Sequence, residues 1–454
     1  HSSLYARGTA LLSLGRHAEA DRDFERLVTQ AEDPALQQAS RRMLGLSLIQ
    51  QGRELEASRN YETLAAQATD LQERAEYLLL LAELYHGLKA YDQVVRICGD
   101  IVALVSAGTS MQGGQGIEEK ALFLLGDAQN RLGDYAAVTD TYQEALRRSP
   151  DSIYAPDMTF ASGLSRMQMG QLDEAVVQFE RFLERYQSDA NAVYALYYLG
   201  HIQFSQREFE PALRAFERLV AEFPEHEAAG DVWFRIGECH FNLGRYERAL
   251  SAYGAVLDDR RPGPEQDDAL YNSAWAYMEL NRGEDAVASM KRLLAEFPDS
   301  PLAPSAQFTI GDHYYNEGQY EQALEAYQGL ARDYPNDELV AEVPELVEDL
   351  REAMAFTRYQ EIVLDFRQAM AGEDDESLRS IVARMERLAA EYPNTETEVA
   401  VLNNMGISYE SLNEWKLAVG VYDRVIARHD AGIGTPEAAQ FARQHRDWIV
   451  AYRL

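Results

Sequence analysis

One set of residues recurs every 37 positions along most of this 454-residue chain. Each recurrence begins at a glycine or alanine, which we call the anchor. The residues 12, 16 and 19 positions later tend to be small, aromatic and apolar, as in Ala212, Phe216 and Leu219 after the anchor Gly200. A period of this length indicates an array of similar repeats rather than several unrelated domains. Eleven repeats align in this way, with anchors at Gly8, Gly45, Ala82, Gly126, Gly163, Gly200, Gly237, Ala274, Gly311, Ala369 and Gly406.

Each repeat has the pattern of two short helices joined by a turn. Small residues at the anchor and 12 positions later let two antiparallel helices approach closely, while the residues at 16 and 19 share one face of the second helix. Proline ends the second helix in five repeats, at Pro150, Pro224, Pro298, Pro335 and Pro393. The sequence therefore predicts an all-α array of about eleven helix-turn-helix repeats, each contacting mainly its neighbours.

This pattern resembles the tetratricopeptide repeat (TPR) family over nearly the whole chain. The usual period of that family is 34 residues. The additional residues here follow the second helix, in linkers such as Phe297-Pro298-Asp299-Ser300 and Tyr334-Pro335-Asn336. The resemblance implies a right-handed superhelix, an α-solenoid whose concave groove is lined by the first helices. It also implies a protein- or peptide-binding scaffold that is not an enzyme.

The linkers also resemble those of TPR proteins of the bacterial cell envelope. These include the lipoprotein of the outer-membrane β-barrel assembly machine and the periplasmic coordinator of the Tol–Pal system. The resemblance implies a periplasmic or outer-membrane-associated scaffold for an envelope complex. A cytoplasmic location is the alternative, because cytoplasmic TPR proteins use similar linkers. No apolar run reaches the ~18–20 residues that span a bilayer, so we expect no direct membrane insertion.

Two interruptions of the period suggest how the chain is divided. Anchors 82 and 126 are 44 residues apart, and the excess is a glycine-rich stretch expected to form a flexible loop. Anchors 311 and 369 are 58 residues apart, which predicts an additional helix at 338–356 and a longer one at 357–371. The expected segments are repeats at 1–105, the loop at 106–117, repeats at 118–337, inserted or extended helices at 338–371, and C-terminal repeats with a terminal helix at 372–454.

The net charge is strongly negative. The chain has 42 Lys and Arg against 75 Asp and Glu, which gives a formal charge of −33. A surface this acidic repels nucleic acid and attracts cationic partners. Residues 333–400 alone hold 18 acidic and 6 basic residues. We therefore expect a protein or peptide partner, with a basic segment as one option, and no nucleic acid. A solvated surface that aids solubility is the alternative explanation of the charge.

The sequence contains no recognisable catalytic or metal-binding motif. Its nine histidines form no HExxH or HxH spacing, there is no GxSxG motif, and Cys98 and Cys239 form no CxxC pair. We expect both cysteines to act as small buried apolar side chains. The sequence therefore predicts no catalytic residue, no metal and no cofactor.

Aromatic, Met and charged residues recur at four positions of the predicted first helices. Positions three before and four after the anchor are seven apart, so they share one helix face. Positions six before and one after the anchor add carboxylates, a histidine and a tryptophan. The candidate binding residues are Phe160, Met167, Tyr197, His201, Phe204, Asp231, Phe234, Glu238, Phe241, Asp268, Tyr271, Trp275, Phe308, Asp312 and Tyr315.

Two interpretations of this stripe stay open. It could pack neighbouring first helices together, because solenoids bury continuous apolar seams. It could instead line a groove for an extended or helical peptide, with aromatic anchors and carboxylates that favour Arg or Lys. The family's clamp for a C-terminal carboxylate uses polar residues three before and one after the anchor. It is incomplete here, since Arg42 lies three before the anchor Gly45 but the residue one after it is Leu46. The alternative function is a structural or oligomerising solenoid that uses its terminal or convex surfaces.

Overall fold

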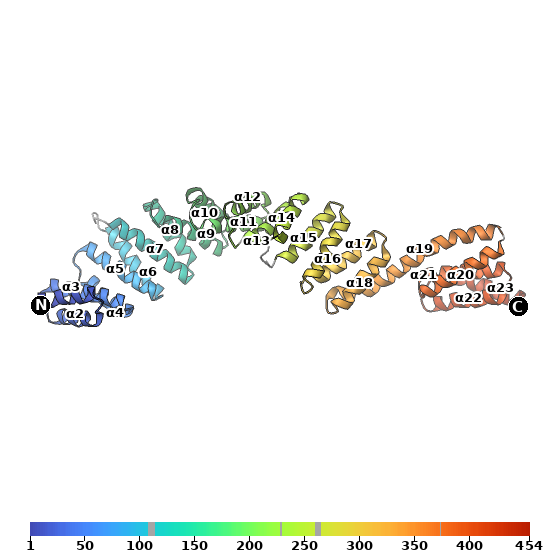
Figure 1. The fold of residues 1–454 in the computed structure, drawn as a ribbon, viewed down its shortest axis with the longest axis horizontal. Helices are drawn as coiled ribbons and strands as arrows, with labels where there is room; N and C mark the ends of the chain where they lie inside the picture. The colour runs from blue at the N-terminus through green and yellow to red at the C-terminus, as the bar shows by residue number, and fades with distance from the viewer. Residues whose placement is uncertain (108–113, 228, 259–264, 373) are drawn as a thin grey trace. The chain divides into compact units, whose positions relative to one another are not determined.

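The computed structural model describes residues 1–107, 114–227, 229–258, 265–372 and 374–454. These residues form helices joined by short turns, and no strand occurs among them. The chain divides into two compact units, residues 1–243 and 244–454, called here the N-terminal and C-terminal units. Eleven helix pairs and a final helix follow one another along the described residues (Figure 1). The predicted all-α solenoid is confirmed.

The N-terminal unit contains the first thirteen helices. Their bounds are α1 (Ser2–Ser13), α2 (His17–Gln30), α3 (Pro34–Gln50), α4 (Glu54–Gln67), α5 (Leu71–Gly87), α6 (Tyr91–Ala107), α7 (Gly114–Leu132), α8 (Tyr135–Arg148), α9 (Ala155–Gln168), α10 (Leu172–Arg185), α11 (Ala192–Ser205), α12 (Phe209–Glu222) and α13 (Ala229–Asn242). Odd-numbered helices are the first helices of their repeats.

The C-terminal unit begins with the second helix of the seventh repeat. Its elements are α14 (Tyr246–Asp258), α15 (Gln266–Glu279), α16 (Gly283–Glu296), α17 (Ala303–Asn316), α18 (Tyr320–Asp333), the short 3-10 helix η1 (Glu338–Ala341), α19 (Val343–Gly372), α20 (Asp375–Glu391), α21 (Glu396–Ser411), α22 (Trp415–Asp430) and α23 (Pro436–Tyr452). The last of these is the predicted terminal helix.

Glycine anchors lie under the aromatic ring 16 residues further along the chain. A methyl group added to Gly200 would lie 2.5 Å from Cε1 of Phe216, and one added to Gly311 would lie 2.5 Å from Cε1 of Tyr327. Both rings are almost completely buried. The missing side chain on the first helix therefore makes room for the ring of the second. The same arrangement recurs in the pairs Gly8–Phe24, Gly45–Tyr61, Gly126–Tyr142, Gly163–Phe179 and Gly406–Tyr422.

Alanine anchors occur where the residue 16 positions later is not aromatic. In these repeats, Cys or Met replaces the ring. The alanine anchors and their Cys or Met partners are all at most 6% exposed. A slightly larger anchor is thus matched by a slimmer partner, which keeps the space between the two helices filled. The three pairs are Ala82–Cys98, Ala274–Met290 and Ala369–Met385.

The turn inside the repeat also has a fixed geometry. In ten of the eleven repeats the residue seven positions after the anchor has a positive φ. Six of these residues are glycines, but Lys89 and Arg207 occupy the position with φ of 58° and 61°. The left-handed conformation costs a residue with a Cβ about 1 kcal/mol. The tight turn is therefore kept even where the local sequence opposes it.

The insertion near residue 340 differs from the prediction of two helices. After η1, a single helix of 30 residues, α19, runs from Val343 to Gly372. No glycine interrupts it before Gly372, and its one proline, Pro344, lies in the first turn, where the missing N–H costs nothing. The sequence between 343 and 371 thus has no signal that would end a helix, and the expected break near residue 357 is wrong.

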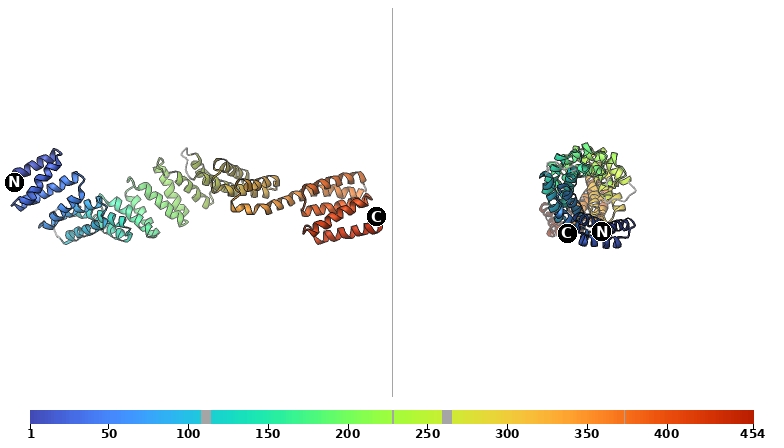
Figure 2. Two further views of the ribbon diagram at one scale, coloured as in Figure 1. Left: turned by 90° about the horizontal axis from the view of Figure 1, so that it is seen from below. Right: turned by 90° about the vertical axis from the view of Figure 1, so that its left-hand side faces the viewer.

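The long helix α19 packs against α18, α20 and α21 within the C-terminal unit (Figure 2). In the first third of α19, the Glu352 carboxylate accepts hydrogen bonds from the backbone N–H groups of Glu396 and Thr397, at 2.7 and 2.9 Å. These N–H groups open α21 and have no partner inside their own helix. The α19 helix therefore both provides the tenth anchor and caps the next repeat.

Helices occupy both ends of the segment 106–117, where a flexible loop was expected. The structure places residues 106–107 in α6 and 114–117 in α7, while residues 108–113 lie outside the described part of the chain. Across the residues that are described, no helix is both long and apolar enough to cross a bilayer.

Candidate functional site

The fifteen predicted binding residues all lie on first helices, and they divide between the two units. We call the two groups the α9–α13 face and the α15–α17 face. The α9–α13 face consists of Phe160, Met167, Tyr197, His201, Phe204, Asp231, Phe234, Glu238 and Phe241. The α15–α17 face consists of Asp268, Tyr271, Trp275, Phe308, Asp312 and Tyr315.

Aromatic residues three positions before the anchor serve mainly to pack helices. The ring centroid of Phe160 lies 5.8 Å from that of Phe179 and 5.6 Å from that of Phe182, both on α10. Phe234 is only 6% exposed. Phe308 packs against the core of the C-terminal unit. These rings hold the first helix against its neighbours, so at these three positions the structure favours the packing interpretation.

The α9–α13 face contains a hydrogen-bonded network around Asp231. The Tyr197 hydroxyl donates to Asp231 Oδ2 at 3.0 Å, and His201 Nε2 lies 3.5 Å from the same oxygen. Burial opposes ionisation of Asp231, but the neighbouring His201 side chain, the hydrogen bond from Tyr197 and the nearby charge of Arg235 hold its pKa below the usual value. Burial, reinforced by the Asp231 charge, raises the pKa of Tyr197 to about 12. The Asp231 carboxylate is therefore ionised, and the nearby Arg235 already balances its negative charge.

Arg235 completes this network and was not among the predicted residues. Its guanidinium donates to Glu238 Oε2 at 2.7 Å and lies over the rings of Phe204 and Phe234, at 5.8 and 5.7 Å from their centroids. Cation–π contacts of this kind are favourable when desolvated. The spacing of Asp231, Arg235 and Glu238, four and three residues apart on a helix, is the signal that could have revealed it.

The α15–α17 face exposes two large aromatic side chains. Trp275 and Tyr315 are each 38% exposed. The Tyr271 ring stands edge-on to Trp275 with centroids 6.2 Å apart, and Tyr320 approaches Tyr315 in the same way at 5.9 Å. Each exposed ring is thus supported from one side and open on the other. Exposed, rigidly held Trp and Tyr are the residue types that most often anchor a protein partner.

Carboxylates accompany these aromatic residues. Asp312 accepts a hydrogen bond from the Tyr327 hydroxyl at 2.6 Å. Burial and this bond raise the pKa of Tyr327. Asp268 is half-buried on α15, seven residues before Trp275. The C-terminal unit carries 39 acidic and 20 basic residues, so the electrostatic potential around this face favours cationic groups.

Burial suppresses the reactivity of both cysteines. Cys98 and Cys239 are buried, and burial raises the pKa of each thiol to about 12. Neither is a nucleophile at neutral pH, because the thiolate is the reactive form. Within the described ranges, no three His, Cys, Asp or Glu side chains are placed to hold a metal ion.

Comparison with protein families identifies the class of this fold. Models described as tetratricopeptide repeat match residues 5–57, 160–227, 197–264 and 271–338, and two others of the same description match 120–152 and 401–433. Together they cover more than half of the chain, which therefore belongs to the tetratricopeptide repeat family. The repeats anchored by Ala82 and Ala369 lie outside the matches.

Solved structures resemble the chain only in part. MamA is 20% identical, covers 41% of this chain and 93% of its own, and has a TM-score of 0.34. YrrB, described as a TPR protein with an unusual peptide-binding site, is 22% identical, covers 41% and 90%, and has a TM-score of 0.35. The C-terminal part of a TPR protein from Cytophaga hutchinsonii is 13% identical, covers 58% and 98%, and has a TM-score of 0.43. A comparison with curated proteins found no similar sequence.

Proposed function

We propose that this chain is a non-enzymatic scaffold that binds a protein or peptide partner on the α15–α17 face. The observation that carries the proposal is the pair of supported, 38% exposed aromatic residues, Trp275 and Tyr315, on first helices of consecutive repeats. A solenoid that only packed its repeats together would gain from burying them, since each 38% exposed ring forgoes roughly a third of the about 1.5–3 kcal/mol that full burial of a large apolar side chain is worth.

The partner that fits this face carries Arg or Lys beside apolar groups. Aromatic rings supply contact area and attract cations over their faces. The Asp312 carboxylate lies on the same helix as Tyr315 and has one oxygen engaged by Tyr327. A basic partner would also be drawn in by the excess of acidic residues in this unit, and its association rate would fall as salt is raised.

Affinity capture with matched variants tests the proposal. The full chain is immobilised and exposed to an extract of its source, as wild type, as Trp275→Ala/Tyr315→Ala, and as Phe356→Ala. Phe356 is 49% exposed in the same unit but lies outside the face, so it controls for loss of any exposed aromatic ring. Truncation of an anchor costs about 2 kcal/mol or more. The double variant should therefore lose the partner that wild type and Phe356→Ala retain. Equal recovery with all three proteins would reject the face.

We further propose that the scaffold serves the assembly of a bacterial envelope complex, in the periplasm or at the outer membrane. The support is the Tyr/Phe-Pro-Asp/Asn linker after the second helix, which resembles that of envelope TPR proteins. Fractionation of source cells, followed by protease treatment of spheroplasts, tests the location. Cleavage in spheroplasts supports it, while protection until lysis places the chain in the cytoplasm.

The structural or oligomerising role remains the competing function. Sedimentation of the wild type at several concentrations distinguishes the two. Self-association that survives Trp275→Ala/Tyr315→Ala, together with no captured partner, would favour contacts through the terminal or convex surfaces over a partner on the α15–α17 face.

A further inference from the structure

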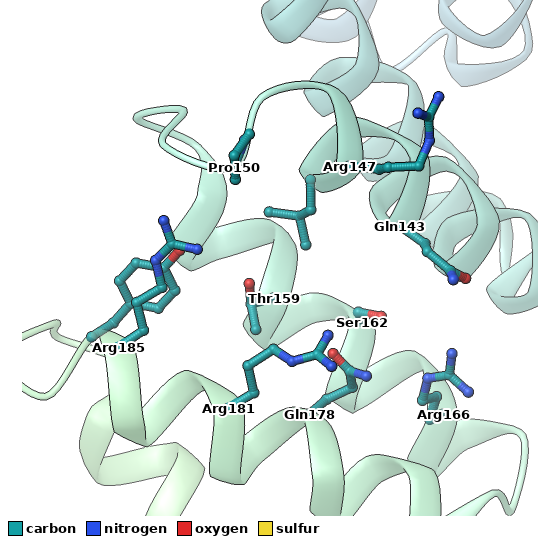
Figure 3. Close-up of a pocket in the computed structure, with 11 residues that line it drawn as sticks. Gln143, Arg147, Pro150, Thr159, Ser162, Arg166, Gln178, Arg181 and Arg185 are labelled. Atoms are coloured by element: carbon teal, nitrogen blue, oxygen red, sulfur yellow. The ribbon is translucent and has the colours of Figure 1, made fainter.

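Four arginines converge on one cavity of this acidic chain. The cavity, of about 470 Å³, lies in the N-terminal unit between α8 and α10, with α9 behind it (Figure 3). Its lining includes no acidic residue. Figure 3 shows Arg181 and Gln178 of α10 facing Thr159 and Ser162 of α9. The arginines that line it are Arg147, Arg166, Arg181 and Arg185.

Two of these arginines are already paired at the rim. Arg147 donates to both carboxylate oxygens of Glu144, at 2.7 and 2.8 Å. Together with Arg148, this pairing lowers the pKa of Glu144 to about 2. Arg185 donates to Asp151 at 2.5 Å. These two cations are thus neutralised by acids outside the lining, and they supply little net charge to the cavity.

The other two arginines have N–H groups that donate no hydrogen bond within the described residues. Arg181 has no hydrogen bond or ion pair with any residue that the structure describes. Arg166 donates one long hydrogen bond, from Nη1 to the side-chain oxygen of Gln171 at 3.5 Å, and its Nε is buried without a hydrogen-bond partner. A buried, unpaired N–H of a cation is costly. The cavity therefore presents donors that a ligand with anionic oxygens would satisfy.

The next repeat provides an internal comparison, because a second cavity lies at the equivalent place 37 residues later. There, Glu180 and Glu184 replace Gln143 and Arg147. Leu196 and Leu199 replace the hydroxyl residues Thr159 and Ser162, and Gln203 replaces Arg166. Arg218 corresponds to Arg181, but it is paired with Glu222 at 2.7 Å. The second cavity also has an arginine without a described ion pair, Arg214, but two glutamates share its lining. A lining with several arginines and no acidic residue is thus a property of the first cavity and does not follow from the repeat itself.

We propose that the cavity between α8 and α10 binds carboxylate side chains of an acidic peptide segment of a partner protein. Arg181 and Arg166 would pair with the carboxylates, because the guanidinium fork matches a planar carboxylate. The Ser162 hydroxyl and the Gln178 amide would donate further hydrogen bonds. The lining also has an apolar side, formed by Leu146, Pro150 and Tyr186. This side can pack against the apolar groups of a peptide, whereas a free phosphate ion has none. The cavity would then select a partner segment opposite in charge to the one proposed for the α15–α17 face.

Fluorescence anisotropy with a defined peptide tests this site on the full chain. The probe is a fluorescein-labelled peptide of sequence Asp-Leu-Glu-Asp-Leu-Glu, and its control has Asn and Gln in place of the acids. Both are measured at about 0.15 M salt, where repulsion from distant acidic residues is screened. The acidic peptide should bind and the neutral one should not. Arg181→Ala should weaken binding about tenfold or more, as loss of a charge-assisted hydrogen bond predicts, whereas Arg218→Ala should leave it within about twofold.

A second variant keeps the proposal testable without touching an arginine. Thr159→Leu/Ser162→Leu copies the lining of the neighbouring cavity and should also abolish binding, with the circular dichroism spectrum unchanged. No binding by wild type, or equal binding by Arg181→Ala, would overturn the proposal. If inorganic phosphate displaces the labelled peptide at constant ionic strength, the site binds phosphate instead. Trp275→Ala/Tyr315→Ala should bind the acidic peptide normally, so failure of the other face would not affect this test.

Discussion

Replacing Gly200 by Ala should destabilise the protein, although glycine is normally a poor residue inside a helix. In an open helix this change stabilises by about 0.5–1 kcal/mol. Here the new methyl group would lie 2.5 Å from Cε1 of Phe216, a ring that is fully buried between the two helices. Overpacking of this kind costs about 1–3 kcal/mol. The net result should be a loss of about 1–2 kcal/mol in the free energy of unfolding.

The structure also predicts how to reverse the loss. Three repeats combine an alanine anchor with Cys or Met, as in Ala274 with Met290. Phe216→Met should therefore be less harmful in the Gly200→Ala background than in the wild type, with a coupling of about 1–2 kcal/mol. Urea unfolding followed by circular dichroism measures all four proteins.

Gly99 provides the control for this experiment. It lies in helix α6, and a methyl group there would meet no atom within 4 Å. Gly99→Ala should raise the urea midpoint, while Gly200→Ala should lower it. If both substitutions raise it, or if the Gly200 and Phe216 changes are simply additive, the packing of ring on glycine does not determine how the two helices approach.

Three further predictions follow from other parts of the molecule. Arg207→Gly should stabilise the protein by about 1 kcal/mol, measured as a higher thermal midpoint, because it removes the cost of a Cβ at φ 61°; a lower midpoint would contradict this reading of the turn. Arg428→Ala should destabilise it by about 3 kcal/mol in urea, because Arg428 bonds at 2.8 Å to the carboxylate of Glu398, which is 1% exposed; a change below about 1 kcal/mol would show that Arg424 replaces it. The lowered pKa of Asp231 means that its ionised form stabilises the fold above the ordinary Asp pKa of about 3.9, and that this contribution disappears as pH falls below it. Wild type should therefore lose stability below pH about 4 more steeply than Asp231→Asn, and parallel pH profiles would argue against this network.

The helix pairs could be predicted from the sequence because they depend on contacts within one repeat. The match of Gly200 with Phe216 needs only a fixed spacing and a known helix geometry, and both recur along the chain. The continuous α19 helix could not be inferred in the same way. Its length depends on packing against α18, α20 and α21, whereas the broken period at 338–371 shows only that residues were added.

The candidate sites were less accessible to sequence reasoning. The spacing of the aromatic stripe shows that its members share a face, but not how deeply each is buried. Phe234 is 6% exposed and Trp275 is 38% exposed, because the adjoining helices cover one and not the other. The arginine cavity was missed altogether, since its lining combines α8 of one repeat with α9 and α10 of the next, and these residues become neighbours only when the repeats stack.

The most direct test of the proposed function is photocrosslinking from the α15–α17 face itself. A photoreactive phenylalanine analogue is placed at position 275, or at position 356 as a control of similar exposure, and the full chain is irradiated in an extract of its source. The scaffold account predicts a discrete protein adduct from position 275 that is absent from position 356 and weakens with added salt. No adduct at position 275, or the same adducts from both positions, would contradict it.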